Sequence, residues 1–238
     1  MAWIRAGENP SKLIARGELD DRLEVYQHGT CAWILDHPGY LQWRNAKNST
    51  TLWHNAPPGC GKTMLASHVA DTLRASLSGD SVIWYFCSFN DPVRKHPINV
   101  FRSLALQILK ITPVLPDRLI KIFKEEVENE EAFLTYHRTL EKVIHELLSV
   151  TKRVHILIDG LDECLPADAT PLLGMITRLV SGASQRHGIT KWLFTSRKEG
   201  PILKTMLDLG AIEVSPTEED RTADIQTYLQ NRLQGNAT

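Results

Sequence analysis

One short stretch of this chain, APPGCGKT from Ala56 to Thr63, carries residues that could bind phosphate. It ends as the pattern G-x-x-x-x-G-K-[ST] ends, with Lys62 before the threonine, but an alanine stands at the first glycine position. Gly59 and Gly61 allow the backbone to curl, so that successive N–H groups point inward at phosphate oxygens beside the positive end of the following helix. The alanine is tolerated there if its φ angle is negative. The stretch therefore predicts a nucleotide site.

Within the loop we expect Lys62 to reach the β- and γ-phosphates and the hydroxyl of Thr63 to bind Mg²⁺. The other residues expected to bind the nucleotide here are Pro58, Gly59, Cys60, Gly61 and Met64. The alternative interpretation is an ordinary helix start that carries a surface lysine.

A second motif, VHILIDGLDEC, supplies the acids that such a loop requires. Asp159 ends a buried strand and can hold Mg²⁺ through its water shell. Asp162 and Glu163 form an acidic pair, and either can orient the attacking water, because hydrolysis requires a carboxylate near the γ-phosphate. The alternative is that these acids only cap the next helix. Together the two motifs predict an Mg²⁺-dependent nucleoside triphosphatase.

A third element is KWLFTSR, which places polar and cationic groups at the carboxyl edge of a strand. Open α/β sheets bind their ligands at that edge. Arg197 is the candidate sensor of the γ-phosphate, and its alternative role is a surface salt bridge. Arg94 and Lys95 follow another expected strand, and we interpret them as solvated loop residues. The alternative is that they approach the phosphates.

The elements that position these residues alternate along the chain. Apolar runs predict strands over TTLWHN, SVIWYFCSF, RVHILIDGL, KWLFTSR and AIEV. These runs are nearly continuous in apolar residues, as strands buried on both faces of a parallel sheet are. Helical patterns fill the intervals, and a last helix after Thr217 is expected to bury Ile225, Leu229 and Leu233. We predict a three-layer α/β P-loop NTPase fold with a central parallel sheet of about five strands and a helical N-terminal lead-in.

Composition limits the partners. Lys and Arg number 27 and Asp and Glu 28, so the net charge of -1 gives no basic field that would collect nucleic acid. The 4 cysteines show no metal-finger spacing and suit reduced thiols. No run approaches the ~18 apolar residues that cross a bilayer. We expect a cytoplasmic protein whose partners include neither nucleic acid nor a membrane.

With APPGCGKT, VHILIDGLDEC and FTSR in this order, the chain resembles the NACHT nucleotide-binding domains of the STAND class of NTPases. HGTCAWILDHPGYLQW and WYFCSFNDPVRKHPINVFRSLALQIL are most similar to the fungal version, found in receptors related to heterokaryon incompatibility and NOD-like immunity. The resemblance implies a switch driven by ATP or GTP that controls oligomerisation. It implies that Gly29 and Thr30 approach the base and ribose. The roles it implies for the motifs are phosphate and metal binding by Lys62 and Thr63, Mg²⁺ binding by Asp159, hydrolysis by Asp162 and Glu163, and sensing by Arg197.

The resemblance also sets the expected organisation. Residues 1–48 would form the helical lead-in and residues 49–238 the NTPase core, without the winged-helix segment and repeats that follow in family members. Self-association is expected of the full-length protein, with this module mainly monomeric. The leading function is slow, Mg²⁺-dependent hydrolysis of ATP or GTP. The alternatives are a nucleotide-binding scaffold without hydrolysis and a P-loop small-molecule kinase, which would need clustered arginines that the sequence does not show.

Overall fold

The computed structural model describes residues 16–76, 79–128, 136–164, 170–182 and 188–235. Its centre is a five-stranded sheet in the order β2-β3-β4-β1-β5, with every pairing parallel. The strands are β1 (Thr50–Asn55), β2 (Ser81–Phe86), β3 (Arg153–Asp159), β4 (Ile189–Ser196) and β5 (Ile212–Val214). The predicted α/β class and parallel sheet are confirmed.

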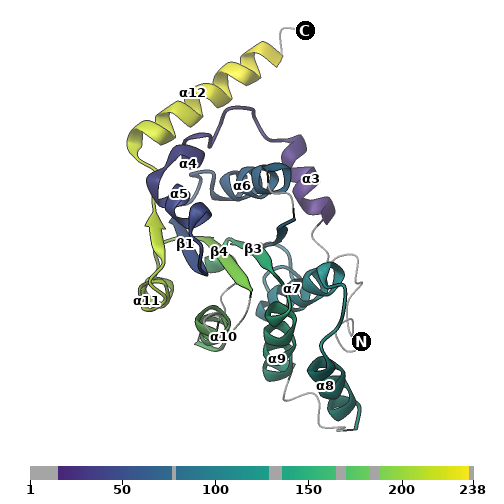
Figure 1. The fold of residues 1–238 in the computed structure, drawn as a ribbon. Helices are drawn as coiled ribbons and strands as arrows, with labels where there is room; N and C mark the ends of the chain where they lie inside the picture. Colours follow the sequence, from purple (N-terminus) through teal and green to yellow (C-terminus); the bar gives the residue numbers. More distant parts are fainter. Residues whose placement is uncertain (1–15, 77–78, 129–135, 165–169, 183–187, 236–238) are drawn as a thin grey trace.

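Helices cover both faces of the sheet (Figure 1). One face carries the helical lead-in and the helix after the glycine-rich loop: α3 (Arg16–Glu24), α4 (Trp33–Asp36), α5 (Pro38–Asn45) and α6 (Lys62–Ser76). The other carries α7 (Pro97–Ile111), α8 (Asp117–Glu128), α9 (Tyr136–Ser149), α10 (Thr170–Ser181) and α11 (Gly200–Asp208). A 3₁₀ turn, η1 (Leu161–Cys164), follows β3, and α12 (Glu218–Gly235) follows β5.

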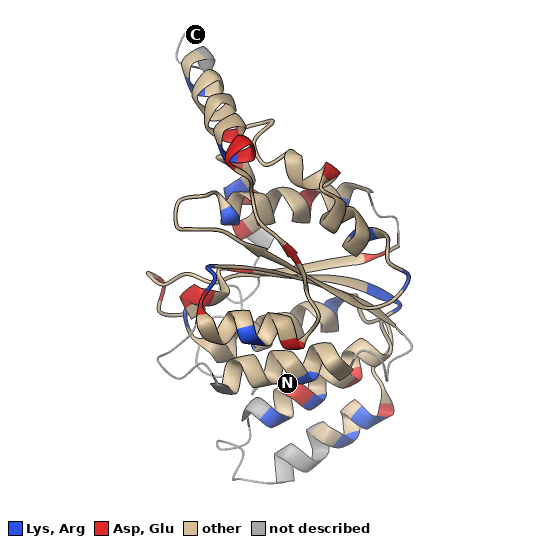
Figure 2. Cartoon of the chain, turned by 90° about the vertical axis from the view of Figure 1, so that its left-hand side faces the viewer, with Lys and Arg blue, Asp and Glu red and all other residues tan. Residues whose placement is uncertain are grey.

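Alternation along the strands divides the core into two apolar layers. On β2, Trp84 and Phe86 pack in the layer of α6, whereas Ile83 and Tyr85 pack in the layer of α7 and α9. Successive side chains of a strand point to opposite faces, so a strand buried on both sides needs an apolar residue at nearly every position. In the view of Figure 2, charged residues of both signs are interspersed over the helices of both layers.

The last helix differs from its prediction. Its side chains Ile225, Leu229 and Leu233 are 61%, 53% and 73% exposed, so their expected burial is wrong. The physical reason is placement: α12 extends away from the sheet and does not lie on it (Figure 1). The helix start is as predicted, because the hydroxyl of Thr217 accepts from the N–H of Asp220, at 3.1 Å.

A buried lysine fastens the lead-in helices to the sheet. Lys191 of β4 is 0% exposed, and its Nζ donates to the carbonyl oxygens of Trp43 and Ala46, at 2.9 and 2.6 Å, and to Thr50 Oγ1, at 3.1 Å. These carbonyls lie at the end of α5, where a cation is favoured. Burial lowers the pKa of Lys191 to about 8.

Two histidines are buried in the strands. His54 of β1 is 0% exposed and His155 of β3 is 1% exposed. Burial lowers the pKa of each to about 4, because the charged imidazolium is poorly solvated there. The folded chain therefore holds both rings neutral near pH 7.

We predict that the free energy of unfolding falls as the pH is lowered from 7 to 5. The unfolded chain binds protons at His54 and His155 near pH 6.5, whereas the folded chain does so only near pH 4, so acid favours unfolding. Each histidine should contribute about 2 kcal/mol to the fall. Urea denaturation at both pH values measures it.

His155→Gln should reduce the fall in the free energy of unfolding between pH 7 and pH 5 by about 2 kcal/mol, whatever the stability of the variant at pH 7. His96→Gln, at an exposed position before α7, is the control and should leave the fall unchanged. A fall that is the same in both variants would contradict the prediction.

Candidate functional site

The glycine-rich loop turns from β1 into α6 with the backbone that its sequence requires. The φ angles of Gly59 and Gly61 are +77° and +72°, which glycine adopts without strain. A Cβ added at Gly59 would meet nothing within 4 Å, so the space in front of the loop is open. Outside glycine, the described residues show a positive φ only at Cys31, so Ala56 has the negative φ on which its tolerance depended.

Lys62 lies across this loop as the first residue of α6. Its Nζ donates to the carbonyl oxygens of Ala56 and Pro57, both at 3.0 Å. The first N–H groups of a helix have no partner within the helix and carry a partial positive charge. The lysine and the helix start therefore concentrate positive charge on one side of the loop, where an anion is favoured.

A buried carboxylate stands beside the loop. Asp159 ends β3 and is 2% exposed; its Oδ2 accepts from Thr63 Oγ1, at 2.8 Å, and its Oδ1 accepts from Thr195 Oγ1. Burial raises the pKa of Asp159, and the hydrogen bonds from Thr195 and Thr63 oppose that rise. The two residues predicted to hold the metal thus lie in contact. A carboxylate and a hydroxyl are the oxygen donors that suit Mg²⁺, so these residues fit the ion.

Thr195 acts on Asp159 in a way that the sequence reasoning missed. Its hydroxyl, besides donating to that carboxylate, accepts the N–H of Gly160, at 2.9 Å. The available signal was a polar residue at the carboxyl end of the strand, directly after three apolar residues. Strand β4 therefore holds both the carboxylate and the backbone that follows it.

The predicted sensor, Arg197, and one of the predicted acids, Asp162, form a salt bridge with each other. Arg197 Nε lies 2.6 Å from Asp162 Oδ2, the Arg197 N–H donates to Asp162 Oδ1, at 3.1 Å, and Nη2 lies 3.3 Å from Glu199 Oε1. The hydrogen bond to Asp162 is the main cause that raises the pKa of Arg197. The Asp162 side chain is 3% exposed, whereas that of Arg197 is 46% exposed.

Glu163 is placed differently from its neighbour. It lies in η1, and its Oε2 accepts the N–H of Phe89, at 3.1 Å, from the segment that follows β2. Within the described part of the chain this carboxylate forms no salt bridge. Of the two predicted acids, Glu163 is therefore the one that is not paired with a cation.

A cavity of about 700 Å³ adjoins the loop. Its lining from the loop and α6 is Gly59, Cys60, Gly61, Met64 and Leu65, and from α12 it includes Ile225, Tyr228 and Leu229. Thr30 also lines the cavity, but Pro58 and Gly29 do not. A Cβ at Gly29 would lie 3.2 Å from Thr227 Cγ2, so that glycine packs closely on α12. The part of the cavity wall that α12 forms was not predicted from the sequence.

Two polar contacts hold α12 beside the segment that joins α3 to α4. The N–H of Cys31 donates to Asp224 Oδ1, at 2.6 Å, and Asn231 Nδ2 donates to the carbonyl of His28, at 2.9 Å. Burial raises the pKa of the Cys31 thiol to about 12. The cavity is thus walled by segments from both ends of the described chain.

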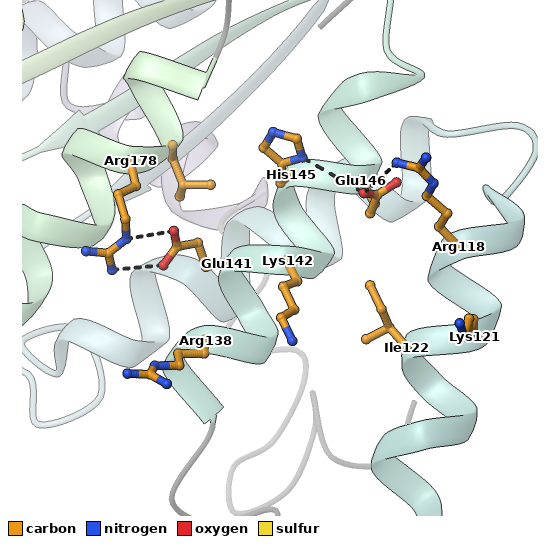
Figure 3. Close-up of a pocket in the computed structure, with 10 residues that line it drawn as sticks. Arg118, Lys121, Ile122, Arg138, Glu141, Lys142, His145, Glu146 and Arg178 are labelled. Atoms are coloured by element: carbon orange, nitrogen blue, oxygen red, sulfur yellow. Dashed lines mark hydrogen bonds and ion pairs between the residues drawn. The ribbon is translucent and has the colours of Figure 1, made fainter. Parts of the chain in front are cut away.

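A second hollow, of about 820 Å³, lies between α8, α9 and α10 (Figure 3). It holds an arginine cluster that the sequence did not reveal: Arg118, Arg138 and Arg178. Two of the arginines face acids, with Arg178 Nε 2.7 Å from Glu141 Oε1 and Arg118 Nη1 4.0 Å from Glu146 Oε1. The hollow shares no lining residue with the loop and lies on the opposite face of the sheet from α6. It therefore does not supply the acceptor pocket of a P-loop kinase.

Arg94, expected to be solvated, is instead tied to two acids. Its Nε lies 2.8 Å from Asp91 Oδ2, and Nη1 pairs with Glu18 of α3, so this residue lies in the predicted loop but its side chain is not freely solvated. Elsewhere in the described ranges, no three His, Cys, Asp or Glu side chains form a metal cluster, and the four cysteines are free. None of the described helices has the length and apolar character that a bilayer crossing requires.

Comparisons with known proteins give both a family and relatives. The family described as "Nephrocystin 3, N-terminal" matches residues 29–197, which include the glycine-rich loop, the acidic motif VHILIDGLDEC and Arg197. The vegetative incompatibility protein HET-E-1 of Podospora anserina is 24% identical over 208 residues, covering 84% of this chain. The chain spans only 15% of that protein's length.

Similar solved structures include the Aeropyrum pernix Orc1 protein in complex with DNA. Its TM-score is 0.47 with 16% identity, and the match covers 91% of this chain and 49% of that one. C. elegans PCH-2 has a TM-score of 0.37 with 15% identity, over 83% of this chain and 46% of that one.

We predict that Thr195→Val destabilises the fold by about 1.5–3 kcal/mol, because a buried carboxylate and the Gly160 N–H each lose a hydrogen bond. Thr190→Val is the matched control: it is buried on the same strand, and among the described residues its hydroxyl is hydrogen-bonded to the neutral Ser49 Oγ, at 3.3 Å. The control should cost about 0.5–1.5 kcal/mol. Urea denaturation at pH 7 compares them, and equal losses would show that Thr195 does not support the carboxylate.

Proposed function

The chain belongs to the Nephrocystin 3, N-terminal family, and on that premise we propose that it binds a purine nucleoside triphosphate with Mg²⁺ and hydrolyses it slowly. The family match and the similarity to HET-E-1 confirm the resemblance to NACHT-type NTPases of the fungal incompatibility type. The finer proposal is that nucleotide controls self-association in a longer receptor.

One observation carries the proposal: Thr63 and Asp159, from motifs far apart in sequence, lie in hydrogen-bond contact at the mouth of an open glycine loop. In P-loop NTPases the corresponding positions bind Mg²⁺, so Thr63 and Asp159 would hold the ion here. When bound, the ion would neutralise phosphate charge. If Thr63 had only a structural role, it would not require a buried carboxylate as its partner, because burying a carboxylate is costly.

In the proposed complex, the glycine-rich loop binds the phosphates and the adjoining cavity binds the base and ribose. We infer that Lys62 exchanges its two carbonyl acceptors for phosphate oxygens, while the N–H groups of the loop hold the other oxygens. The base and ribose would enter the adjoining cavity, where Thr30 offers a polar edge and Tyr228 an aromatic one. Gly29 would act indirectly, by letting the chain pass close to α12.

For hydrolysis we assign different tasks to the two acids. Glu163 would orient the attacking water, because its carboxylate is not neutralised by a cation. Asp162 would position Arg197, whose guanidinium it already holds. That pairing also favours a second candidate function, nucleotide binding without hydrolysis, because an arginine bound to two acids offers little charge to the γ-phosphate.

For the switch we propose that residues 1–48 and α12 report the nucleotide to other parts of a longer protein. The described part of the lead-in and α12 both line the cavity, and α12 exposes Ile225, Leu229 and Leu233. Exposed apolar side chains at such a density support contacts with further segments or copies. The module itself, residues 49–238 with its lead-in, would be mainly monomeric.

We predict that Lys62→Ala weakens binding of Mg-ATP or Mg-GTP by about 1.5–3 kcal/mol, because a charge-assisted contact to phosphate is lost. Isothermal titration calorimetry measures the affinity. Lys204→Ala, on α11 with a side chain that is 79% exposed, is the control and should bind as the wild type does. Unchanged affinity in Lys62→Ala would remove the nucleotide from this loop.

We predict turnover well below the ~1–10³ s⁻¹ typical of enzymes. Glu163→Gln should lower the rate of phosphate release further without lowering nucleotide affinity, because it removes the group that orients the water. Glu219→Gln, exposed in the first turn of α12, is the control and should leave the rate unchanged. Fast turnover that is independent of protein concentration would contradict the slow-switch proposal.

A further inference from the structure

A second arginine reaches the carboxyl edge of the sheet from the lead-in. Arg22 belongs to the last turn of α3, which packs on α6, and its guanidinium carbon lies 4.4 Å from the centroid of the Phe86 ring. Phe86 ends β2 and is paired in register with Asp159 of β3. The cation is therefore placed beside the buried carboxylate, on the α6 side of the sheet. It lies outside the residues that the family match covers, 29–197.

Acids lie near Arg22 but do not saturate the hydrogen-bond donors of its guanidinium. Burial lowers the pKa of its guanidinium, and the charges of Asp159 and then Glu163 oppose that fall only in part. Its Nε is buried and has no hydrogen-bond partner among the described residues. An N–H without an acceptor in a buried position is costly, and a ligand oxygen would relieve that cost.

The nearest acid to Arg22 is shared. Glu18 Oε1 lies 3.6 Å from Arg22 Nη2, and the same oxygen pairs with Arg94, which is also bound to Asp91. Arg197 contrasts with this arrangement, because its Nε is fully engaged by Asp162. Of these two arginines at the edge, Arg22 has the donor that remains to be satisfied.

We propose that Arg22 supplies, from within the chain, the cation that contacts the terminal phosphate of the bound nucleoside triphosphate. The inference rests on the function proposed above. The planar guanidinium matches phosphate oxygens in a bidentate manner, and a cation at the γ-phosphate stabilises the charge that develops during transfer. A diphosphate lacks this group, so Arg22 would make the site prefer triphosphate. It would also connect α3 to the presence of the γ-phosphate.

The test compares Arg22→Gln with Arg74→Gln. Arg74 is the matched control because its guanidinium carbon lies 5.5 Å from the centroid of the Trp84 ring and its Nη1 lies 3.5 Å from Asp20 Oδ1 of α3. It thus joins the same helix and strand, but Trp84 is paired in register with Leu157, earlier on β3 than Asp159. Calorimetry with Mg²⁺ and either a non-hydrolysable triphosphate analogue or the diphosphate gives the ratio of the two affinities.

Arg22→Gln should lower the ratio of triphosphate to diphosphate affinity about tenfold, since one charge-assisted contact to phosphate is lost. Phosphate release at saturating nucleotide should fall by at least about tenfold. Arg74→Gln should leave both within about twofold of wild type, because a surface pair contributes little. Arg22→Lys keeps the charge but not the bidentate geometry of the guanidinium, so its affinity ratio should lie between those of Arg22→Gln and the wild type.

An unchanged ratio in Arg22→Gln, or equal loss of both nucleotides, overturns the proposal. If that variant does not fold, Arg22→Lys decides, and a wild-type ratio in it overturns the proposal as well. Lys62→Ala measured in parallel separates the two levels of inference. Lost binding in Lys62→Ala with an unchanged ratio in Arg22→Gln refutes only the role of Arg22, whereas intact binding in Lys62→Ala refutes the nucleotide site itself.

Discussion

The arrangement of this molecule depends on one buried carboxylate, that of Asp159. An ionised group in an apolar interior costs several kcal/mol unless hydrogen bonds compensate it. Here the compensation comes from Thr63, at the start of α6, and from Thr195, near the end of β4. The first turn of the helix after the loop and the ends of two neighbouring strands are therefore fixed relative to each other by a single side chain. The open loop keeps its place because its helix is held in this way.

The charged side chains around that carboxylate differ in how far each is already paired or hydrogen-bonded. Asp162 is held by Arg197, Glu163 accepts only a backbone N–H among the described groups, and Arg22 retains an unused donor. A site in which every acid and base were paired would bind an anion with metal poorly, since each ion pair would have to be broken first. A site with no pairs would be costly to fold. The observed distribution lies between these limits.

The sequence predicted the parts that follow from local pattern. The five apolar runs became the five strands, and the glycines of APPGCGKT adopt the positive φ angles that the phosphate-binding pattern implies. Contacts between distant segments were not predictable in this way. The helical spacing of Ile225, Leu229 and Leu233 defines one side of a helix, but not whether anything covers it. Arg22 was missed because nothing in α3 indicates which end of β2 it meets. The support of Asp159 by Thr195 requires the register between β3 and β4.

The strand order also determines when each strand pairing of the sheet can form during synthesis. Strand β1, which leads into the loop, pairs only with β4 and β5 among the described strands, and its Thr50 stands opposite Lys191. During synthesis from the N-terminus, Leu52 and Trp53 leave the ribosome long before their neighbours exist. Pairing of strands so distant in sequence is slow, and exposed apolar strands attract other chains in the meantime. The glycine-rich loop is therefore made early but can acquire its final support only after β4 has been made, and β1 stays without its sheet partners until then.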